Sequence, residues 1–252
     1  MTSAFDGIVL GGGRSRRMGT NKVLLEVDGR ALLRTAVEAL AGARKIALVA
    51  PPEVCAHAFP QGLPSNVVQT LEDPPDGGPV AGIQAGLAAL AAPTTADADG
   101  GLANACLPAP PLAPPRSPDR VHPAQRTPEP APTVGIVAAD HPGAVAAMRA
   151  LRVAGGCDLP PGVDGYCALG PEGVPQWMLG FYRRQYILNR LDDAFAGSGQ
   201  DVAVRRLFAA ATLEVVPLPP RDTLDLDSPS DLEEYSVSQA NSAEAPERSE
   251  PS

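Results

Sequence analysis

Lysine is nearly absent from this sequence of 252 residues, in which aromatic residues and histidine are also scarce. Only Lys22 and Lys45 are lysines among the 20 cationic residues, and the net charge is −9. This balance argues against a nucleic-acid partner, because binding a phosphate backbone needs a basic surface. A lysine at position 22 is therefore a less routine choice than it is in a lysine-rich chain.

Closely spaced cysteines and long apolar runs are missing as well. The four cysteines stand singly, with no C-x-x-C pair and no paired histidines near them, so we expect neither a zinc site nor a disulfide framework. No run approaches the roughly 18 apolar residues of a membrane span. The N-terminus also lacks a basic segment followed by a long apolar stretch. The sequence therefore predicts a cytoplasmic protein that does not enter a membrane.

Short apolar runs alternate with segments of helical periodicity along most of the chain. The sequence predicts strands at Phe5–Leu10, Lys45–Ala50, Val67–Leu71, Thr133–Ala139 and Leu213–Val216, and helices at Arg30–Ala43, Val80–Ala91, Ala144–Leu151, Arg183–Phe195 and Val202–Ala210. Tyr166–Leu169 and Gln176–Tyr182 predict a hairpin. This alternation is typical of an α/β fold with a single doubly wound, mostly parallel, Rossmann-like sheet, helices on both faces and a β-hairpin excursion.

The alternation stops between Ala92 and Pro132, where 11 of the 41 residues are proline. Such a segment cannot bury enough apolar surface to offset the entropy of ordering it. We expect one domain at 1–235, interrupted by a flexible insertion at 92–132 and followed by a disordered tail at 236–252. The PxxP-like stretches of the insertion are candidate docking ligands for a partner, but a tolerated surface insertion is the favoured interpretation.

The loop Gly11–Lys22 combines glycines with cations directly after the first predicted strand. Glycines let backbone N–H groups approach phosphate oxygens closely, and Arg14, Arg16, Arg17 and Lys22 place four cations within twelve residues. No Gly-Lys-Ser/Thr closes the loop, so it is not a Walker A motif. A solvated basic loop is the simpler alternative, but glycines, cations and position together favour the binding of a nucleoside triphosphate.

The same loop resembles the signature of molybdenum cofactor guanylyltransferases and related small nucleotidyltransferases, approximately L-A-G-G-x-S-x-R-M-G-x-D-K-x-L-L. Here the stretch 10–25 reads LGGGRSRRMGTNKVLL. The resemblance continues at Glu72-Asp73, Gly78–Gly82, Ala139–Pro142, Pro175–Trp177 and Asp225–Leu232. It covers most of the chain outside the insertion and the tail.

The resemblance implies a set of nucleotide-binding residues. Main-chain groups of Leu10, Gly11 and Gly12 would line the guanine and ribose side of the pocket. Lys22 would contact the phosphates, and Asp73 would help to recognise the nucleoside.

The resemblance also implies a catalytic set of Lys22, Arg17 and Asp140. Arg17 would neutralise charge on the leaving pyrophosphate, and Asp140 would bind Mg²⁺ and, through it, the triphosphate. Physical chemistry supports the metal role, because a carboxylate beside a triphosphate is repelled unless a hard divalent cation bridges the two. The alternative is that Asp140 only caps the following turn.

Three further residues are candidates for the site. Asp227 and Trp177 each have two interpretations, and His141 has no expected role in catalysis. Asp227 is a candidate second metal contact, but a contact with loop N–H groups is favoured. Trp177 either walls a pterin pocket or packs in the core. His141 is expected to be incidental, because a phosphate monoester acceptor is already ionised at neutral pH and needs no general base.

The function implied by the resemblance is transfer of GMP from GTP to molybdopterin, or its metal-loaded form, with release of pyrophosphate. Transient contacts with proteins of molybdoenzyme maturation are a further implication. In the family, an asparagine in the stretch after the second strand can contact the nucleotide, but here this stretch is Val49-Ala50-Pro51. The residues themselves therefore do not identify the base of the nucleotide. One alternative uses CTP or another small phosphorylated acceptor. Another is a catalytically silent nucleotide-binding partner in cofactor maturation.

Overall fold

The computed structural model of the chain describes residues 4–12, 22–92, 129–171, 173–195, 199–227, 231–232 and 235. Its strands are β1 (Phe5–Leu10), β2 (Glu26–Val27), β3 (Arg30–Ala31), β4 (Ile46–Val49), β5 (Val67–Thr70), β6 (Thr133–Ala138), β7 (Gly165–Leu169), β8 (Pro175–Arg183) and β9 (Leu213–Pro217). Its α-helices are α1 (Leu32–Ala39), α2 (Pro52–Ala58), α3 (Pro79–Ala91), α4 (Ala144–Val153), α5 (Arg184–Phe195), α6 (Val204–Phe208) and α7 (Pro220–Thr223), and a 3-10 turn, η2, covers Lys22–Leu24.

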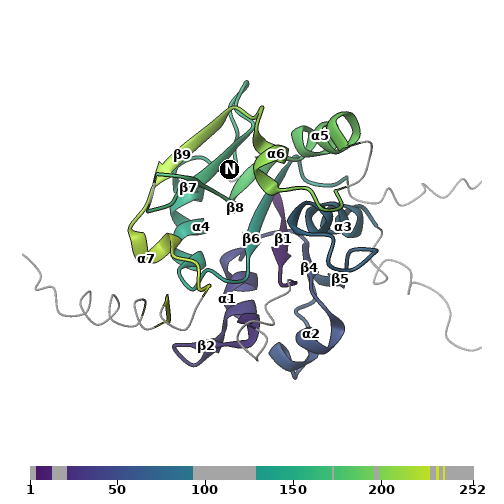
Figure 1. Ribbon diagram of the computed structural model, residues 1–252, viewed down its shortest axis with the longest axis vertical. Coiled ribbons are helices and arrows are strands. Elements are labelled where there is room, and N and C mark those ends of the chain that lie inside the picture. Colours follow the sequence, from purple (N-terminus) through teal and green to yellow (C-terminus); the bar gives the residue numbers. More distant parts are fainter. Residues whose placement is uncertain are drawn as a thin grey trace, which may run out of the picture.

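Within the described residues, a seven-stranded sheet in the order β5-β4-β1-β6-β8-β7-β9 forms the centre of the molecule (Figure 1). β5, β4, β1 and β6 pair in parallel, β8 runs antiparallel between β6 and β7, and β9 is parallel to β7. The predicted mostly parallel α/β sheet with a hairpin, β7–β8, is therefore confirmed.

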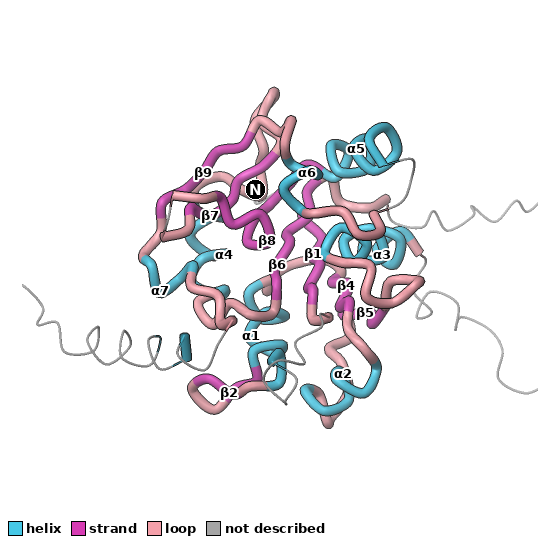
Figure 2. The backbone as a smooth tube through the Cα atoms, viewed as in Figure 1, coloured by secondary structure: helices cyan, strands magenta, loops and turns pink. Residues whose placement is uncertain are grey.

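Both faces of the sheet are covered by helices, as Figure 2 shows. Neighbouring residues of β1 point to opposite faces, and they belong to different core clusters: Val9 packs with α1, α2 and α4, whereas Ile8 packs with α3, α5 and α6. The strands of such a doubly covered sheet are apolar on both sides. All six residues of β1 and of β6 are accordingly buried.

Three local elements differ from the sequence-based expectation. The helix predicted from Arg30 begins at Leu32, because Arg30–Ala31 pairs with Glu26–Val27 around Asp28 and Gly29. Both turn residues have positive φ, 54° and 71°, as a two-residue hairpin requires. The helices α2 and α7 were not predicted. Both have proline at the first helical position, where its missing N–H costs nothing.

Two adjacent cations hold the chain on either side of the segment 93–128, which lies outside the described residues. Lys45 Nζ donates to the carbonyl oxygens of Ala89 and Ala92 at 2.9 and 2.8 Å. Arg44 Nη2 donates to the carbonyl of Glu129 at 2.7 Å. Both cations directly precede β4, so the segment leaves and rejoins the domain at the amino-terminal edge of the parallel strands.

A buried ion pair lies at the same edge. Arg184 Nη2 contacts Asp6 Oδ2 at 2.7 Å, and both side chains are almost fully buried. The same Asp6 oxygen accepts the N–H of Ala131, and the carbonyl of Ala131 accepts from Arg184 Nε, both at 2.8 Å. Ala131 is itself buried, so the packed core already includes this residue near the expected end of the insertion. In the part of the chain that the structure describes, no helix is long and apolar enough to cross a membrane.

Candidate nucleotide-binding site

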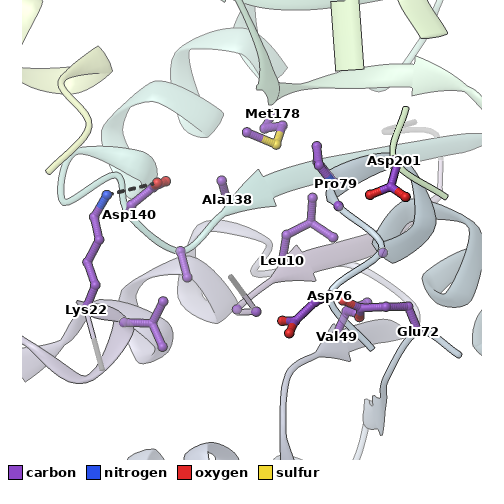
Figure 3. Close-up of a pocket in the computed structure, with 16 residues that line it drawn as sticks. Leu10, Lys22, Val49, Glu72, Asp76, Pro79, Ala138, Asp140, Met178 and Asp201 are labelled. Carbon is purple, nitrogen blue, oxygen red and sulfur yellow. Dashed lines mark hydrogen bonds and ion pairs between the residues drawn. The ribbon is translucent and has the colours of Figure 1, made fainter. Parts of the chain in front are cut away.

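A pocket of about 430 Å³ opens at the carboxyl ends of the parallel strands, the edge at which α/β sheets bind ligands. Its wall is formed by the residues that end β1, β4 and β6, by η2, by the loop after β5 and the start of α3, and by Met178 and Asp201. Figure 3 shows these side chains around Leu10. The pocket lies opposite the edge at which Lys45 and Arg44 hold Ala92 and Glu129.

Leu10, Gly11 and Gly12, at the end of β1, form the floor of the pocket. Their main-chain contacts with a nucleotide stay a prediction. Gly11 N–H donates to the Val49 carbonyl at 2.9 Å, which continues the pairing of β1 with β4. A Cβ on Gly11 would lie 2.5 Å from Leu33 Cδ1, so the close approach of α1 explains a glycine here. Among the described residues, a Cβ on Gly12 would meet only the Val49 carbonyl oxygen, at 3.9 Å, so packing against them does not require this glycine.

Lys22 lies at one end of the pocket beside Asp140 (Figure 3). Its ammonium bridges the carboxylates of Asp140 and Asp227. Its Nζ is 2.7 Å from Asp227 Oδ1 and 3.3 Å from Asp140 Oδ2, and its side chain is 6% exposed. Burial by itself lowers the pKa of Lys22. The hydrogen bond that Lys22 donates to Asp227 and the charges of both carboxylates outweigh this effect and raise the pKa above its usual value. The ammonium is therefore fully charged at neutral pH.

Asp140 directly follows β6. One of its carboxylate oxygens accepts a hydrogen bond, and the other has no hydrogen-bond partner among the described residues. Its Oδ2 faces Lys22, whereas its Oδ1 is buried and has no hydrogen-bond partner among the described residues. His141 Nε2 lies 3.8 Å from Oδ1, and His141 Nδ1 lies 3.3 Å from the Leu224 carbonyl oxygen. A buried carboxylate oxygen without a donor is suited to a cation that is not part of the chain.

The opposite end of the pocket is acidic. Glu72 and Asp76 come from the loop after β5, and Asp201 comes from the segment before α6 (Figure 3). Asp201 N–H donates to the Gly77 carbonyl at 2.8 Å, which fixes this segment against the start of α3. The pocket thus has a charge-paired end, at Lys22 and Asp140, and an end rich in hydrogen-bond acceptors.

The sequence matches the model of the MobA-like NTP transferase domain over residues 7–212. The chain belongs to this family. The match includes the floor of the pocket, Lys22 and Asp140, and family membership makes the protein a nucleotidyltransferase. No curated protein matches the sequence significantly.

Solved structures show the same fold at low sequence identity. Molybdopterin-guanine dinucleotide biosynthesis protein A from Archaeoglobus fulgidus has 16% identity and a TM-score of 0.51, with 94% of this chain and 100% of that chain covered. Rv0371c from Mycobacterium tuberculosis H37Rv has 20% identity and a TM-score of 0.55, with 92% and 97% covered. The 4-diphosphocytidyl-2C-methyl-D-erythritol synthase from Anaerococcus prevotii DSM 20548 has 10% identity and a TM-score of 0.57, with 95% and 100% covered.

This member of the MobA-like family brings Leu10, Gly11, Gly12, Lys22 and Asp140 together in one pocket. Asp73 is exposed and does not line that pocket, whereas its neighbour Glu72 does, so a role for Asp73 in nucleoside recognition stays a prediction. Arg17 and the other arginines of its loop lie in 13–21, outside the described residues.

Other residues of the MobA-like pocket escaped the sequence analysis. Asp76, Asp201 and Met178 line it without any motif that would have singled them out. The Asp227 carboxylate accepts a hydrogen bond from Lys22, a contact that the sequence analysis did not predict. The N–H of Asp227 donates to the carboxylate of Asp231. The predicted contact of Asp227 with loop N–H groups stays a prediction, since residues 228–230 lie outside the described residues. Trp177 packs against the core on the side of α3 and α5, in agreement with the core interpretation.

Proposed function

We propose that the protein transfers GMP from GTP to molybdopterin or its metal-loaded form and releases pyrophosphate. The observation that carries the proposal is the pairing of Lys22 with Asp140 at one end of a pocket whose floor is the glycine-rich end of β1. An oxygen of the acceptor's terminal phosphate attacks the α-phosphorus of GTP. The bond from that phosphorus to the oxygen bridging to the β-phosphate breaks, and its electron pair leaves with pyrophosphate.

The residues of the pocket divide this work between charge and position. Lys22 is charged, buried and close to the glycines, so it is placed to hold phosphate oxygens and to neutralise the charge that builds on the leaving group. The backbone of Leu10–Gly12 orients the nucleotide. No side chain is needed as a general base, because a phosphate monoester is ionised at neutral pH.

Asp140 is the residue proposed to hold Mg²⁺. Its buried Oδ1 without a hydrogen-bond donor fits a hard cation, which typically binds one or two carboxylates together with phosphate oxygens. The described residues contain no group of three or more candidate ligands, which suits a metal that arrives with the nucleotide. When bound, Mg²⁺ would supply neutralisation of the phosphate charge.

The acidic end of the pocket supports a guanine base. Guanine presents adjacent N1–H and N2–H donors, which one carboxylate can accept together, whereas cytosine offers a single amino group on its pairing edge. Glu72, Asp76 and Asp201 place three carboxylates at the end away from Lys22. CTP remains the second candidate, because one of the similar structures bears the name of a diphosphocytidyl synthase.

Incubation with Mg²⁺, molybdopterin and each nucleoside triphosphate in turn tests the proposal. Mass spectrometry should detect a molybdopterin–GMP adduct with GTP and only traces with the other triphosphates. An adduct formed with CTP but not with GTP would replace the proposed donor. Absence of any adduct, together with normal GTP binding, would favour the catalytically silent partner.

A further inference from the structure

The contact between Lys22 and Asp227 joins the first loop of the domain to the segment that follows α7. The two residues are 205 positions apart, and at 2.7 Å this contact is shorter than the 3.3 Å from Lys22 to Asp140. The Asp227 side chain is 77% exposed, whereas that of Lys22 is 6% exposed. A solvent-exposed carboxylate therefore provides the closer partner for a buried cation.

The backbone at Asp227 is held in place independently of Lys22. Leu226 N–H donates to the Asp140 carbonyl at 3.0 Å, and the Leu226 side chain is buried against Leu32 and Tyr235. Asp227 N–H donates to Asp231 Oδ2 at 2.7 Å. Because these contacts fix the main chain up to and including the N–H of Asp227, its carboxylate is able to orient the longer and more flexible lysine side chain.

The two carboxylates around Lys22 differ in what else they can bind. Asp140 lines the pocket and keeps a buried oxygen with no hydrogen-bond donor, whereas Asp227 does not line the pocket. A cation bound at Asp140 competes with Lys22 for the same carboxylate, since both are positive. Lys22 then needs a second anchor to stay at the phosphate end of the pocket.

We propose that Asp227 is a positioning residue: it holds the Lys22 ammonium at the phosphate end of the pocket, so that the Asp140 carboxylate is free for the metal-bound nucleotide. The proposal rests on the proposed function only for the identity of that nucleotide. In this proposal Asp227 binds the Lys22 ammonium and is not a metal ligand. Loss of the Asp227 charge should therefore disturb Lys22 in the protein without any ligand.

The scarcity of lysine makes a direct test feasible. Selective ¹⁵N and ¹³C labelling of lysine yields signals from only Lys22 and Lys45, and the variant Lys45→Arg assigns them. In the metal-free protein, Asp227→Asn should shift the Lys22 side-chain signals and accelerate exchange of its Nζ protons with water at least severalfold. Asp227→Glu should restore part of the wild-type spectrum. The exposed Asp193→Asn on α5 is the matched control and should leave both lysines unchanged.

Unchanged Lys22 signals in Asp227→Asn, with circular dichroism showing a folded protein, would overturn the proposal. The experiment needs no nucleotide, so its failure can be distinguished from a failure of the proposed transfer of GMP from GTP.

Binding measurements distinguish the lysine role from a metal role. Calorimetry at saturating Mg²⁺ should show that Asp227→Asn weakens GTP binding about tenfold, the effect of one charged contact. The Mg²⁺ concentration that gives half of the maximal GTP binding should stay within twofold of the wild-type value. If that concentration rises tenfold while GTP binding at saturating Mg²⁺ is unchanged, Asp227 is a metal ligand and the proposal is wrong.

Discussion

Replacement of Lys22 by alanine tests the central feature of the site. The ammonium is the charge shared by Asp140 and Asp227, and it is the only cationic side chain among the described residues that line the pocket. Loss of one preorganised electrostatic contact to a transition state costs about 2.7–4 kcal/mol, which corresponds to a decrease of kcat on the order of 10²–10³. We therefore expect Lys22→Ala to retain about 1% of the wild-type kcat or less.

The variant also leaves two carboxylates facing each other. Because their oxygens lie 2.7 and 3.3 Å from the same nitrogen, they are at most about 6 Å apart. Their repulsion is roughly 1 kcal/mol in water and about 3 kcal/mol at an effective dielectric constant of 20. The exposure of Asp227 favours the value in water, so this repulsion is small beside the loss of the contact to the transition state.

The assay is pyrophosphate release under saturating GTP, Mg²⁺ and acceptor. Lys22→Arg keeps the charge but not the compact ammonium, and it should recover part of the activity. Lys45→Ala is the matched control, because it removes the other lysine at the opposite edge of the sheet and should lower the melting temperature without changing kcat. A kcat of Lys22→Ala within threefold of the wild type would refute the assignment of Lys22.

Three further predictions concern the rest of the domain. Asp6→Asn leaves Arg184 buried without its counter-charge and should lower the free energy of unfolding by about 3 kcal/mol in urea denaturation, and a loss below about 1 kcal/mol would show that the pair is weak. Replacement of 93–128 by a Gly/Ser linker of about ten residues should preserve kcat, because both flanks are held at the edge opposite the pocket; lost turnover would show that the segment takes part in the reaction. Burial raises the pKa of Cys167 to about 11, so at pH 8 about one thiol in a thousand is ionised and the residue should resist a thiol reagent until the protein is unfolded. Rapid labelling of Cys167 in the native protein, located by peptide mass, would contradict that last expectation.

Elements with a clear apolar period were predictable, and elements that depend on proline or on two-residue turns were missed. The strands β1, β4, β5 and β6 lie within one residue of the predicted ends, because each begins as a short apolar run. β1, β4 and β6 are buried on both faces, whereas the edge strand β5 is half-buried. Pro51 and Pro52 follow the predicted strand Lys45–Ala50, and Pro52 also begins α2. The dipeptide Asp28-Gly29 is typical of a two-residue hairpin turn. The helical periodicity that begins at Arg30 led instead to the prediction of a helix from that residue.

Site residues were predictable where a motif placed them directly after a strand. Leu10, Gly11, Gly12 and Asp140 line the pocket because parallel strands end at one edge of the sheet. Asp201 was not predictable, since it reaches the pocket through a main-chain hydrogen bond to Gly77 that no local pattern encodes.

Local pattern was therefore sufficient for the α/β architecture and for the edge of the sheet at which the pocket opens, because the burial of each strand is visible in its own apolar residues. The chemistry predicted for the first loop stays a prediction, since residues 13–21 lie outside the described part of the chain. The partners of Lys22 depend on the tertiary arrangement. Asp140 and Asp227 are 118 and 205 positions away in the sequence. Only the strand order and the return of the chain after α7 bring their carboxylates to one ammonium, and a contact of that kind has no period or spacing from which it could be read.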